Sequence, residues 1–471
     1  MNENKKAIQA GFAYTIASFL VVGISFITTP IYTRILSVEE YGSFNNFTSW
    51  LSILMIVITL KLSASFISAR FDFKETFEKY IFSIMTLNVI IVIFCLLIIN
   101  IFIDFFMKIF DLNRLCINLM LAYILFYEII CIYQAREQFS FRYRNATLIS
   151  TAVAIATTLL SILCIIKFED KFIGRIVGYT LPAIVIGAVI YFLFYKKNKG
   201  IDIKYWKYAI PITIPYIPHS LSLILLNSMD KIMIIKIWGD AENGLYSLAY
   251  TCSSLVTVLM SSINSAYGPW LTNNLNMGEH REVRKVSYVY VLCFMFLVIG
   301  IMLVAPEVML ILGGEAYQEA IYVMPPVMMG CAFQLIYTMY VNIEQFKKKT
   351  VGMAFASIIA AISNYVLNYI FIPRKGYLAA AYTTLASYII LTVLHILLVK
   401  KIKMGNIYNN KFMVCVIIMG CVLCVGMNIL YRNNILRYEG ILLYTLLFLI
   451  LAWKYKEKLL SLLKKEGKKN V

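Results

Sequence analysis

The sequence predicts an all-α polytopic membrane protein built from two similar halves, and three observations support this fold class. The chain is 61% hydrophobic and 14% charged, with a mean hydropathy of +0.77. A soluble domain of 471 residues could not bury that much apolar surface. Apolar runs of membrane-spanning length recur between short polar gaps, and one segment is repeated in the second half. Because these runs are about twice as long as barrel strands, we expect them to be helices.

The repeat has an offset of about 202 residues and relates a turn near Gly42 to a turn near Gly244. A repeat of this length indicates duplication of a whole half, and duplicated transporter halves enclose a substrate site at their junction. We therefore expect a first lobe over 1–200, a second lobe over 201–405, and two further spans with a basic tail over 406–471. The matched positions are Arg34 with Lys236, Glu40 with Glu242, Gly42 with Gly244, Phe44 with Tyr246 and Gly174 with Gly376.

About 14 spans are expected, six in each lobe and two after them. The first run follows Lys5 and Lys6, is too long for a signal-peptide core, and is expected to be kept as the first span. The predicted spans lie near 10–32, 46–69, 80–103, 115–134, 147–166, 173–195, 210–229, 244–270, 286–305, 320–345, 351–372, 376–399, 412–431 and 438–454.

The basic residues indicate the orientation. Lys and Arg number 43 against 25 Asp and Glu, a formal charge of +18. Most of the cations fall in alternate gaps and in the tail, which predicts a cytoplasmic (inner) membrane protein with both termini cytoplasmic. The tail over 454–469 is expected to lie on anionic membrane lipid. The positive charge is thus explained without nucleic acid as a partner.

The sequence offers no pattern for catalysis, a metal or a cofactor. The ten cysteines lie in apolar runs and are expected to be free thiols. No nucleotide-binding P-loop and no nucleophile–base set is found, so an enzyme is not predicted. Transport would then be driven by an ion gradient, by the membrane potential or by the gradient of the solute.

Two charged residues inside predicted spans are candidate functional groups, because such charges are costly in a bilayer. Lys61, with Ser65 and Ser68 on the same helical face, either faces a wet cavity and attracts an anionic headgroup or snorkels to the cytoplasmic interface. Glu128 is either a carrier of a coupling proton or a carboxyl hydrogen-bonded to a neighbouring helix. Glu344, close to Lys347, is expected to be an ordinary interfacial charge.

Three prolines follow a helical spacing in the predicted span 210–229. Pro211, Pro215 and Pro218 each remove a helical hydrogen bond, so the helix must bend or open there. Interrupted helices mark sites or hinges in transporters, which suits a rocking motion of the lobes. The alternative is a static kink in a packed bundle.

Further polar residues are candidates for substrate binding. Asp230 and Lys231 are adjacent and cannot pair with each other on a helix, so each needs a partner elsewhere. Arg34 is the candidate partner for Asp230. Asp230 is also a candidate for ion coupling. Asn364 and Asn368 are one turn apart and either line a cavity or join packed helices. His395 is expected to be structural.

Several motifs in a fixed order resemble those of the polysaccharide biosynthesis proteins, the flippases of O-antigen and capsule repeat units. These belong to the multidrug, oligosaccharidyl-lipid and polysaccharide exporter superfamily. The resemblance covers roughly residues 1–400 and rests on the segments 28–36, 40–42, 230–234, 244–250, 266–270, 364–368 and 372–376.

This resemblance implies a transporter that moves an undecaprenyl-diphosphate-linked oligosaccharide across the inner membrane by alternating access. The family's cavities are typically cationic, which fits Lys61 and Arg34. Polysaccharide polymerase and chain-length machinery are the implied partners. One alternative is an ion-coupled drug or metabolite antiporter of the same superfamily, which favours an acid-lined cavity. A second is a membrane-embedded glycan polymerase, which predicts a large outer loop that the sequence lacks.

Overall fold

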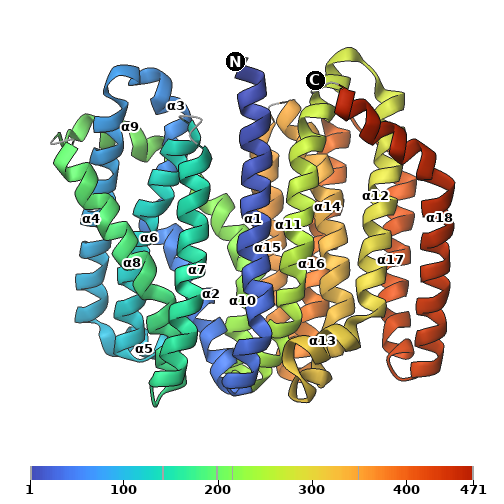
Figure 1. Ribbon diagram of the computed structural model, residues 1–471, viewed down its shortest axis with the longest axis horizontal. Helices are drawn as coiled ribbons and strands as arrows, with labels where there is room; N and C mark the ends of the chain where they lie inside the picture. The colour runs from blue at the N-terminus through green and yellow to red at the C-terminus, as the bar shows by residue number, and fades with distance from the viewer. Residues whose placement is uncertain (1–2, 140–142, 198–199, 215, 348, 469–471) are drawn as a thin grey trace.

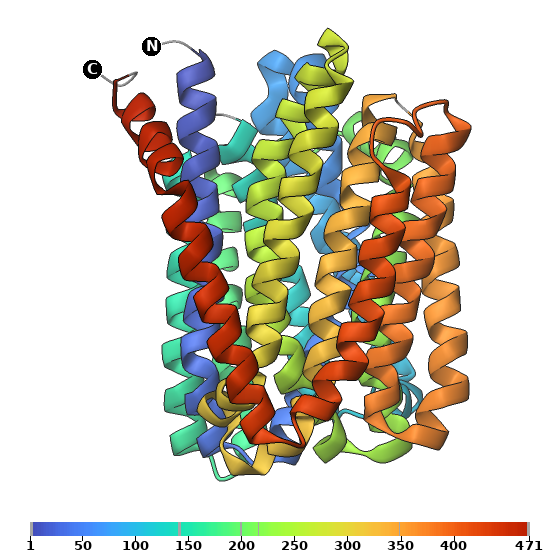
Figure 2. The same cartoon turned by 90° about the vertical axis from the view of Figure 1, so that its right-hand side faces the viewer.

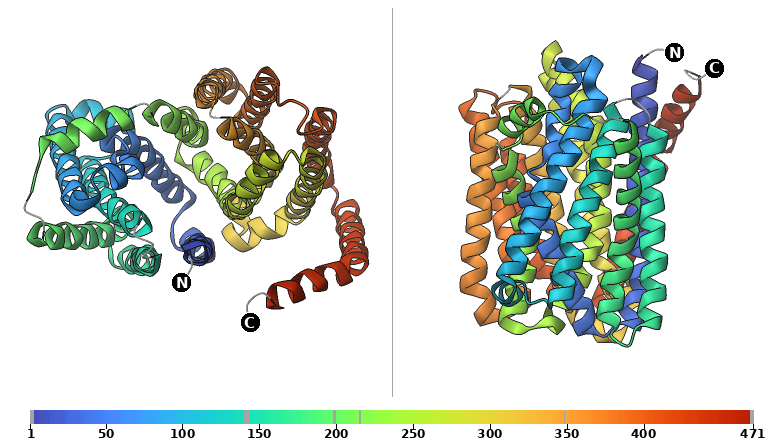
Figure 3. Two further views of the ribbon diagram at one scale, coloured as in Figure 1. Left: turned by 90° about the horizontal axis from the view of Figure 1, so that it is seen from above. Right: turned by 90° about the vertical axis from the view of Figure 1, so that its left-hand side faces the viewer.

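The structure is a computed structural model that describes residues 3–139, 143–197, 200–214, 216–347 and 349–468. The described chain forms eighteen α-helices and three short 3-10 helices, with no strand among these residues. This confirms the predicted all-α class. Most helices run along one direction and stand side by side as two groups (Figures 1 and 3).

The first group comes from the first half of the chain. Its elements are α1 (Glu3–Ile35), α2 (Val38–Thr59), η1 (Leu62–Ser65), α3 (Phe66–Asp72), η2 (Lys74–Thr76), α4 (Phe77–Ile101), α5 (Ile103–Phe110), α6 (Arg114–Phe139), α7 (Tyr143–Lys167), α8 (Lys171–Lys197) and α9 (Ile203–Thr213).

The second group comes from the second half. Its elements are α10 (Tyr216–Trp238), α11 (Asp240–Met277), α12 (His280–Leu303), α13 (Ala305–Gly313), η3 (Glu315–Val323), α14 (Met324–Phe346), α15 (Thr350–Lys375), α16 (Tyr377–Lys401), α17 (Asn410–Leu430) and α18 (Asn434–Lys468).

Two ends of the bundle need names. The first turn of α1 and the last turns of α18 lie at the same end, the upper end in Figure 1, which we call the terminal end. The opposite end carries α5, α13 and the turn between α1 and α2, and we call it the far end (Figure 1).

Eleven helices in the described part of the chain are long and apolar enough to span a membrane. They support a multi-pass membrane protein, but the expected number of 14 is not confirmed. The predicted spans near 10–32, 46–69 and 210–229 are the ones outside this set. Polar residues interrupt the apolar sequence of α2, which contains Asn45 and Asn46, and of α10, which contains Asp230 and Lys231.

The two groups have separate hydrophobic cores. The first core gathers buried side chains between Phe44 and Ala209, with Phe47, Phe66 and Tyr80 fully enclosed. The second gathers buried side chains between Leu226 and Tyr431, together with Tyr41 of α2. Each core is apolar and close-packed.

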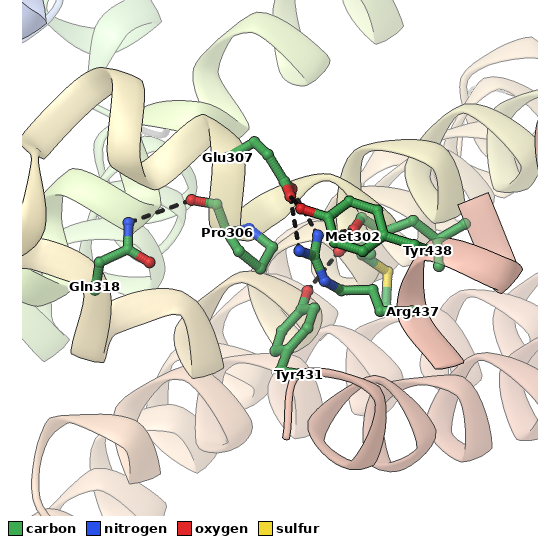
Figure 4. A network of polar contacts seen from close by, with 8 residues as sticks. Met302, Pro306, Glu307, Gln318, Tyr431, Arg437 and Tyr438 are labelled. Carbon is green, nitrogen blue, oxygen red and sulfur yellow. Dashed lines mark hydrogen bonds and ion pairs between the residues drawn. The ribbon is translucent and has the colours of Figure 1, made fainter. Parts of the chain in front are cut away.

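The last two helices are fastened to the second group at the far end (Figure 4). Arg437, at the start of α18, donates two hydrogen bonds of 2.6 and 2.7 Å to the Glu307 carboxylate of α13. Tyr438 donates to the same carboxylate at 2.9 Å, and Tyr431 donates to the Met302 carbonyl at 2.6 Å. From this anchor α18 runs obliquely toward the terminal end (Figure 2).

Candidate functional site

Two adjoining cavities lie where the two groups of helices meet. The first has a volume of about 660 Å³ and is lined mainly by α1, α6, α7 and α8, with Val258 of α11. The second has a volume of about 500 Å³ and is lined by α10, α11, α14 and α16. Ser25 of α1 and Val258 of α11 line both cavities, so the cavities meet at these two residues. Their combined size suits a ligand larger than a single sugar.

Arg175 supplies the positive charge of the first cavity. Its guanidinium carbon lies 3.2 Å from the centroid of the Tyr32 ring and 4.4 Å from that of Phe44. No carboxylate pairs with it among the described residues, and its Nε atom is buried without a hydrogen-bond partner. Aromatic faces stabilise a cation without neutralising it, so Arg175 can still attract an anion.

Sequence reasoning missed Arg175. It stands at the beginning of the predicted span 173–195, where a cation is usually an interfacial residue. The signal available in the sequence was its position two residues inside an apolar run, beside the repeated glycine Gly174.

Lys231 supplies the corresponding charge in the second cavity. Its Nζ lies 5.2 Å from the centroid of the Tyr250 ring, and no carboxylate oxygen lies within ion-pair distance of it in the described part of the chain. Tyr388, also in the cavity wall, donates a hydrogen bond of 2.8 Å to Asn227. Each cavity thus contains one cation that is held over a tyrosine ring.

The predicted candidates Asp230, Asn364 and Asn368 are brought together in one buried hydrogen-bond network. The Asp230 carboxylate accepts from the Tyr246 hydroxyl, from Thr384 at 3.3 Å and from the Lys231 amide at 2.9 Å. Asn364 donates to Thr384 at 3.0 Å, and Asn368 donates to Asn364 at 3.1 Å. The network joins α10, α11, α15 and α16 through oxygen-rich side chains.

The expected pairing of Arg34 with Asp230 is wrong. Arg34 is exposed at the end of α1, where it donates to the carbonyl oxygens of Pro30 and, at 3.3 Å, of Ile311 in α13. The repeat relates Arg34 to Lys236 in sequence. In the structure α1 ends at the far end, whereas Asp230 is enclosed by the second group, so the two residues do not meet. Arg34 therefore joins α1 to α13.

Lys61 was expected inside a continuous helix, but the helix ends just before it. Helix α2 ends at Thr59, and Leu60 and Lys61 take left-handed backbone conformations before η1 begins. The Lys61 side chain is exposed, and Ser65 is turned inward, where its hydroxyl lies 2.6 Å from that of Tyr80. Lys61 still acts electrostatically on Glu128, which is fully buried on α6.

The expectation that Glu344 is interfacial is wrong. Its side chain is 1% exposed and lies 2.7 Å from Nδ1 of the equally buried His395. The nearby Lys347 indicated a helix end, but the packing of α14 against α16 decides the burial of Glu344.

The proline-rich segment interrupts the chain between the two cores. Helix α9 ends at Thr213 and contains Pro211, while α10 begins at Tyr216 and contains Pro218; Pro215 lies outside the described residues. Helix α9 packs against α4 and η1, whereas α10 packs against α2 and α15. The interruption is therefore where the chain leaves the first core.

The two copies of the repeated turn meet each other at the far end. A Cβ added at Gly42 would collide with the Asp240 carbonyl oxygen, and one added at Gly244 would collide with the Val38 carbonyl oxygen. Val38 and Asp240 are themselves related by the 202-residue offset, so the contact is two-fold symmetric. Asn243 adds a hydrogen bond of 2.8 Å to the Gly42 carbonyl. This glycine contact holds α2 and α11 together.

Comparison with known structures identifies the fold, which solved membrane transporters share. It matches the lipid II flippase MurJ in an inward closed conformation with a TM-score of 0.73 at 14% identity, over 96% of this chain and 100% of that one. It also matches an inward-facing multidrug resistance MATE family transporter with a TM-score of 0.53 at 13% identity, over 88% and 95% of the two chains.

The sequence places the chain more narrowly. The family of polysaccharide biosynthesis proteins matches residues 8–275, and the chain belongs to this family. Two proteins of Haemophilus influenzae are also similar. One, described as an uncharacterized membrane protein, is 21% identical over 75% of this chain and 88% of its own length. The other, Lsg locus putative protein 1, is 22% identical over 56% of this chain and 66% of its own length.

Proposed function

We propose that the protein is a flippase that moves an undecaprenyl-diphosphate-linked oligosaccharide across the cytoplasmic membrane, for assembly of O-antigen or capsule. The observation that carries this proposal is the pair of cations in adjoining cavities, Arg175 and Lys231, neither of which is in an ion pair among the described residues. Two cations about a shared space suit a diphosphate, which carries several negative oxygens. Membership of the polysaccharide biosynthesis family supports a glycan as the rest of the substrate.

The cavity walls suit an oligosaccharide. Tyr123 stacks on Tyr127 and on Tyr179, with ring centroids 4.9 and 5.3 Å apart, and all three line the first cavity. Gln134 and Gln138 add amide groups. Ring faces pack on the apolar faces of sugars, while phenol and amide groups bond their hydroxyls. An apolar drug would leave these polar groups without partners.

The proposed mechanism is alternating access between the two groups of helices. The glycine contact of α2 with α11 closes the far end, whereas the first cavity extends to Gln138, close to the terminal end. With both termini cytoplasmic, this arrangement is inward-facing. Opening the far end requires α2 and α11 to separate, and the interrupted segment from Pro211 to Pro218 is the proposed hinge.

Coupling to an ion gradient is proposed to act through the network around Asp230. A buried carboxylate among hydroxyl and amide oxygens can bind a proton or a hard monovalent cation. Because Asp230 directly precedes Lys231, which lines the second cavity, occupancy of the network would alter the charge felt by a bound anion. Asn364 and Asn368 support this site and are not proposed to touch the sugar.

Deletion of the gene tests the proposal. The expected result is loss of the surface polymer, with lipid-linked repeat units stranded on the inner leaflet. Complementation with the wild type restores the polymer, whereas Arg175→Ala at equal protein level does not. Normal polymer with altered tolerance of cationic drugs would contradict the proposal and favour a drug antiporter.

A further inference from the structure

The end of α2 has an unusual backbone. Leu60 and Lys61 have φ values of 52° and 51°, a left-handed conformation that is uncommon in residues other than glycine. Each such residue costs roughly 1–2 kcal/mol, so two in succession persist only where the surroundings hold them. Here Leu62 and Phe66, both with 0% exposure, anchor the following turn in the first core. The strain is thus placed at the turn that carries the exposed Lys61.

A buried carboxyl group lies on α6, which packs against η1 and α3, the two elements that follow this break. Glu128 of α6 is 4% exposed, and its Oε1 atom has no hydrogen-bond partner in the described part of the chain. Lys61 is the charged side chain that acts on it, and no ion pair joins the two. From α6 itself, the titratable neighbours are Tyr127 and Cys131.

A neighbouring acid on the same helix shows the contrast. Glu137 is also fully buried, but it is ion-paired with Arg136, and its other oxygen accepts a hydrogen bond of 2.7 Å from Asn145. Glu137 is therefore satisfied as an anion. Glu128 has no such partners, and a buried charge without partners is strongly unfavourable.

We propose that Glu128 is a proton-binding site and that the bound proton and the Lys61 ammonium compete for its carboxylate. With the proton bound, Glu128 is neutral and Lys61 points outward, as in this structure. With the proton released to water, the carboxylate draws the ammonium inward, and the strained turn at Leu60 and Lys61 relaxes. Either state leaves the buried site without net charge.

The position of this site on α2 explains how it would act on transport, and this part rests on the proposed flippase function. Gly42, near the other end of α2, makes the contact with α11 that closes the far end. A change of the Lys61 position would alter the tilt of α2 and thereby the stability of the glycine contact. Proton binding itself does not depend on the identity of the substrate.

Carbodiimide labelling tests the proton site. Dicyclohexylcarbodiimide reacts with protonated carboxyl groups in apolar surroundings, and peptide mass spectrometry locates the adduct. In the purified full-length protein, Glu128 is expected to be labelled, with labelling that declines as the pH rises. Glu137 is the matched internal control and is expected to remain unlabelled. Glu128→Gln should remove the adduct.

Variants of Lys61 test the competition. Lys61→Ala is expected to raise the pH midpoint of Glu128 labelling by about one unit, because the competing charge is gone. Lys61→Arg, which keeps the charge, should restore the wild-type midpoint. Lys61→Gln gives an independent neutral variant, and size-exclusion chromatography verifies that each variant is folded. Absence of an adduct at every pH, or the same midpoint in Lys61→Ala as in the wild type, would overturn the proposal. Since labelling needs no substrate, this result is independent of the flippase assay.

Discussion

Arg175 and Lys231 show how a membrane protein can keep positive charge in a cavity without losing it to a carboxylate. Both are held over tyrosine rings, at 3.2 and 5.2 Å from the ring centroids. A salt bridge would have stabilised each cation more strongly, but it would also have cancelled the field that attracts an anion. The ring faces provide partial stabilisation and leave the charge available.

Replacement of Arg175 tests this role. Arg175→Ala is expected to weaken binding of a polyprenyl diphosphate roughly 10- to 100-fold, since a hydrogen bond to a charged group contributes about 1.5–3 kcal/mol. Arg175→Lys keeps the charge but loses the planar fork, and should retain part of the affinity. Isothermal titration calorimetry in detergent measures the affinity of both variants. Equal affinity in wild type and Arg175→Ala would remove Arg175 from the binding site.

Asp230 is predicted to control coupling rather than affinity. Asp230→Asn preserves the size of the side chain and an acceptor for the Tyr246 hydroxyl, so the protein should fold. Substrate binding is expected to persist, while an imposed proton or sodium gradient should no longer accelerate transport. Proteoliposomes with and without each gradient provide the measurement. Acceleration as large as in the wild type would show that the coupling ion binds elsewhere.

The role of a single residue was predictable from the sequence only where the neighbouring residues in the chain also indicate whether it is buried. Asp230, Asn364 and Asn368 are polar residues in long apolar runs, and the structure joins them in one network. Arg175 was missed and Glu344 was misjudged because both stand near the ends of apolar runs. Whether such residues face water or a packed neighbour depends on helix contacts that no local pattern contains.

At the scale of the helices, α2 connects the two features that the proposed mechanism uses. Its beginning makes the glycine contact with α11, and its end carries the left-handed turn at Lys61. The prolines made the interruption between α9 and α10 predictable, because proline removes a helical hydrogen bond. The interruption at Leu60 was not predictable, because neither leucine nor lysine signals a helix end.

The glycine contact gives a sharp test at this scale. Gly42→Ala places a methyl group against the backbone of Asp240, which cannot move aside as a flexible side chain could. We expect the closed far end to be destabilised by about 1–3 kcal/mol and transport to be impaired at a normal protein level. A cysteine reagent that cannot cross the membrane, applied to a single cysteine placed at Ser43, should react faster in this variant.

The matched control is Gly426→Ala in α17, where an added Cβ meets no atom within 4 Å. This variant should transport normally and be slightly more stable, because alanine favours helices over glycine. Equal reactivity at position 43 in Gly42→Ala and Gly426→Ala would exclude a gating role for the contact.

For the molecule as a whole, α17 and α18 extend the second group of helices, and the polar anchor at the far end joins them to α13. The Arg437 guanidinium, through its hydrogen bonds, holds the pKa of Glu307 below its ordinary value of 4.5. A depressed carboxyl pKa stabilises the folded state above the ordinary pKa, and this stabilisation is lost as the pH falls through the folded-state value.

The anchor therefore predicts a pH-dependent stability. Lowering the pH below about 4.5 should reduce the melting temperature of the wild type more than that of Glu307→Gln. At neutral pH, Glu307→Gln is expected to lower the free energy of unfolding by about 1 kcal/mol, a small value because the carboxylate is partly exposed. Thermal unfolding in detergent, followed by circular dichroism, measures both effects. Parallel pH profiles for the two proteins would contradict the assigned role of the anchor.

The central claim is that the cavity between the two lobes carries a lipid-linked oligosaccharide from one leaflet to the other. The most direct measurement uses proteoliposomes containing a fluorescent polyprenyl-diphosphate oligosaccharide in both leaflets and a glycosidase outside. With the wild-type protein, the digested fraction should rise from about half toward completion, whereas Arg175→Ala vesicles should remain near half. Digestion that stops at half with folded wild-type protein, under every imposed ion gradient, would contradict the account.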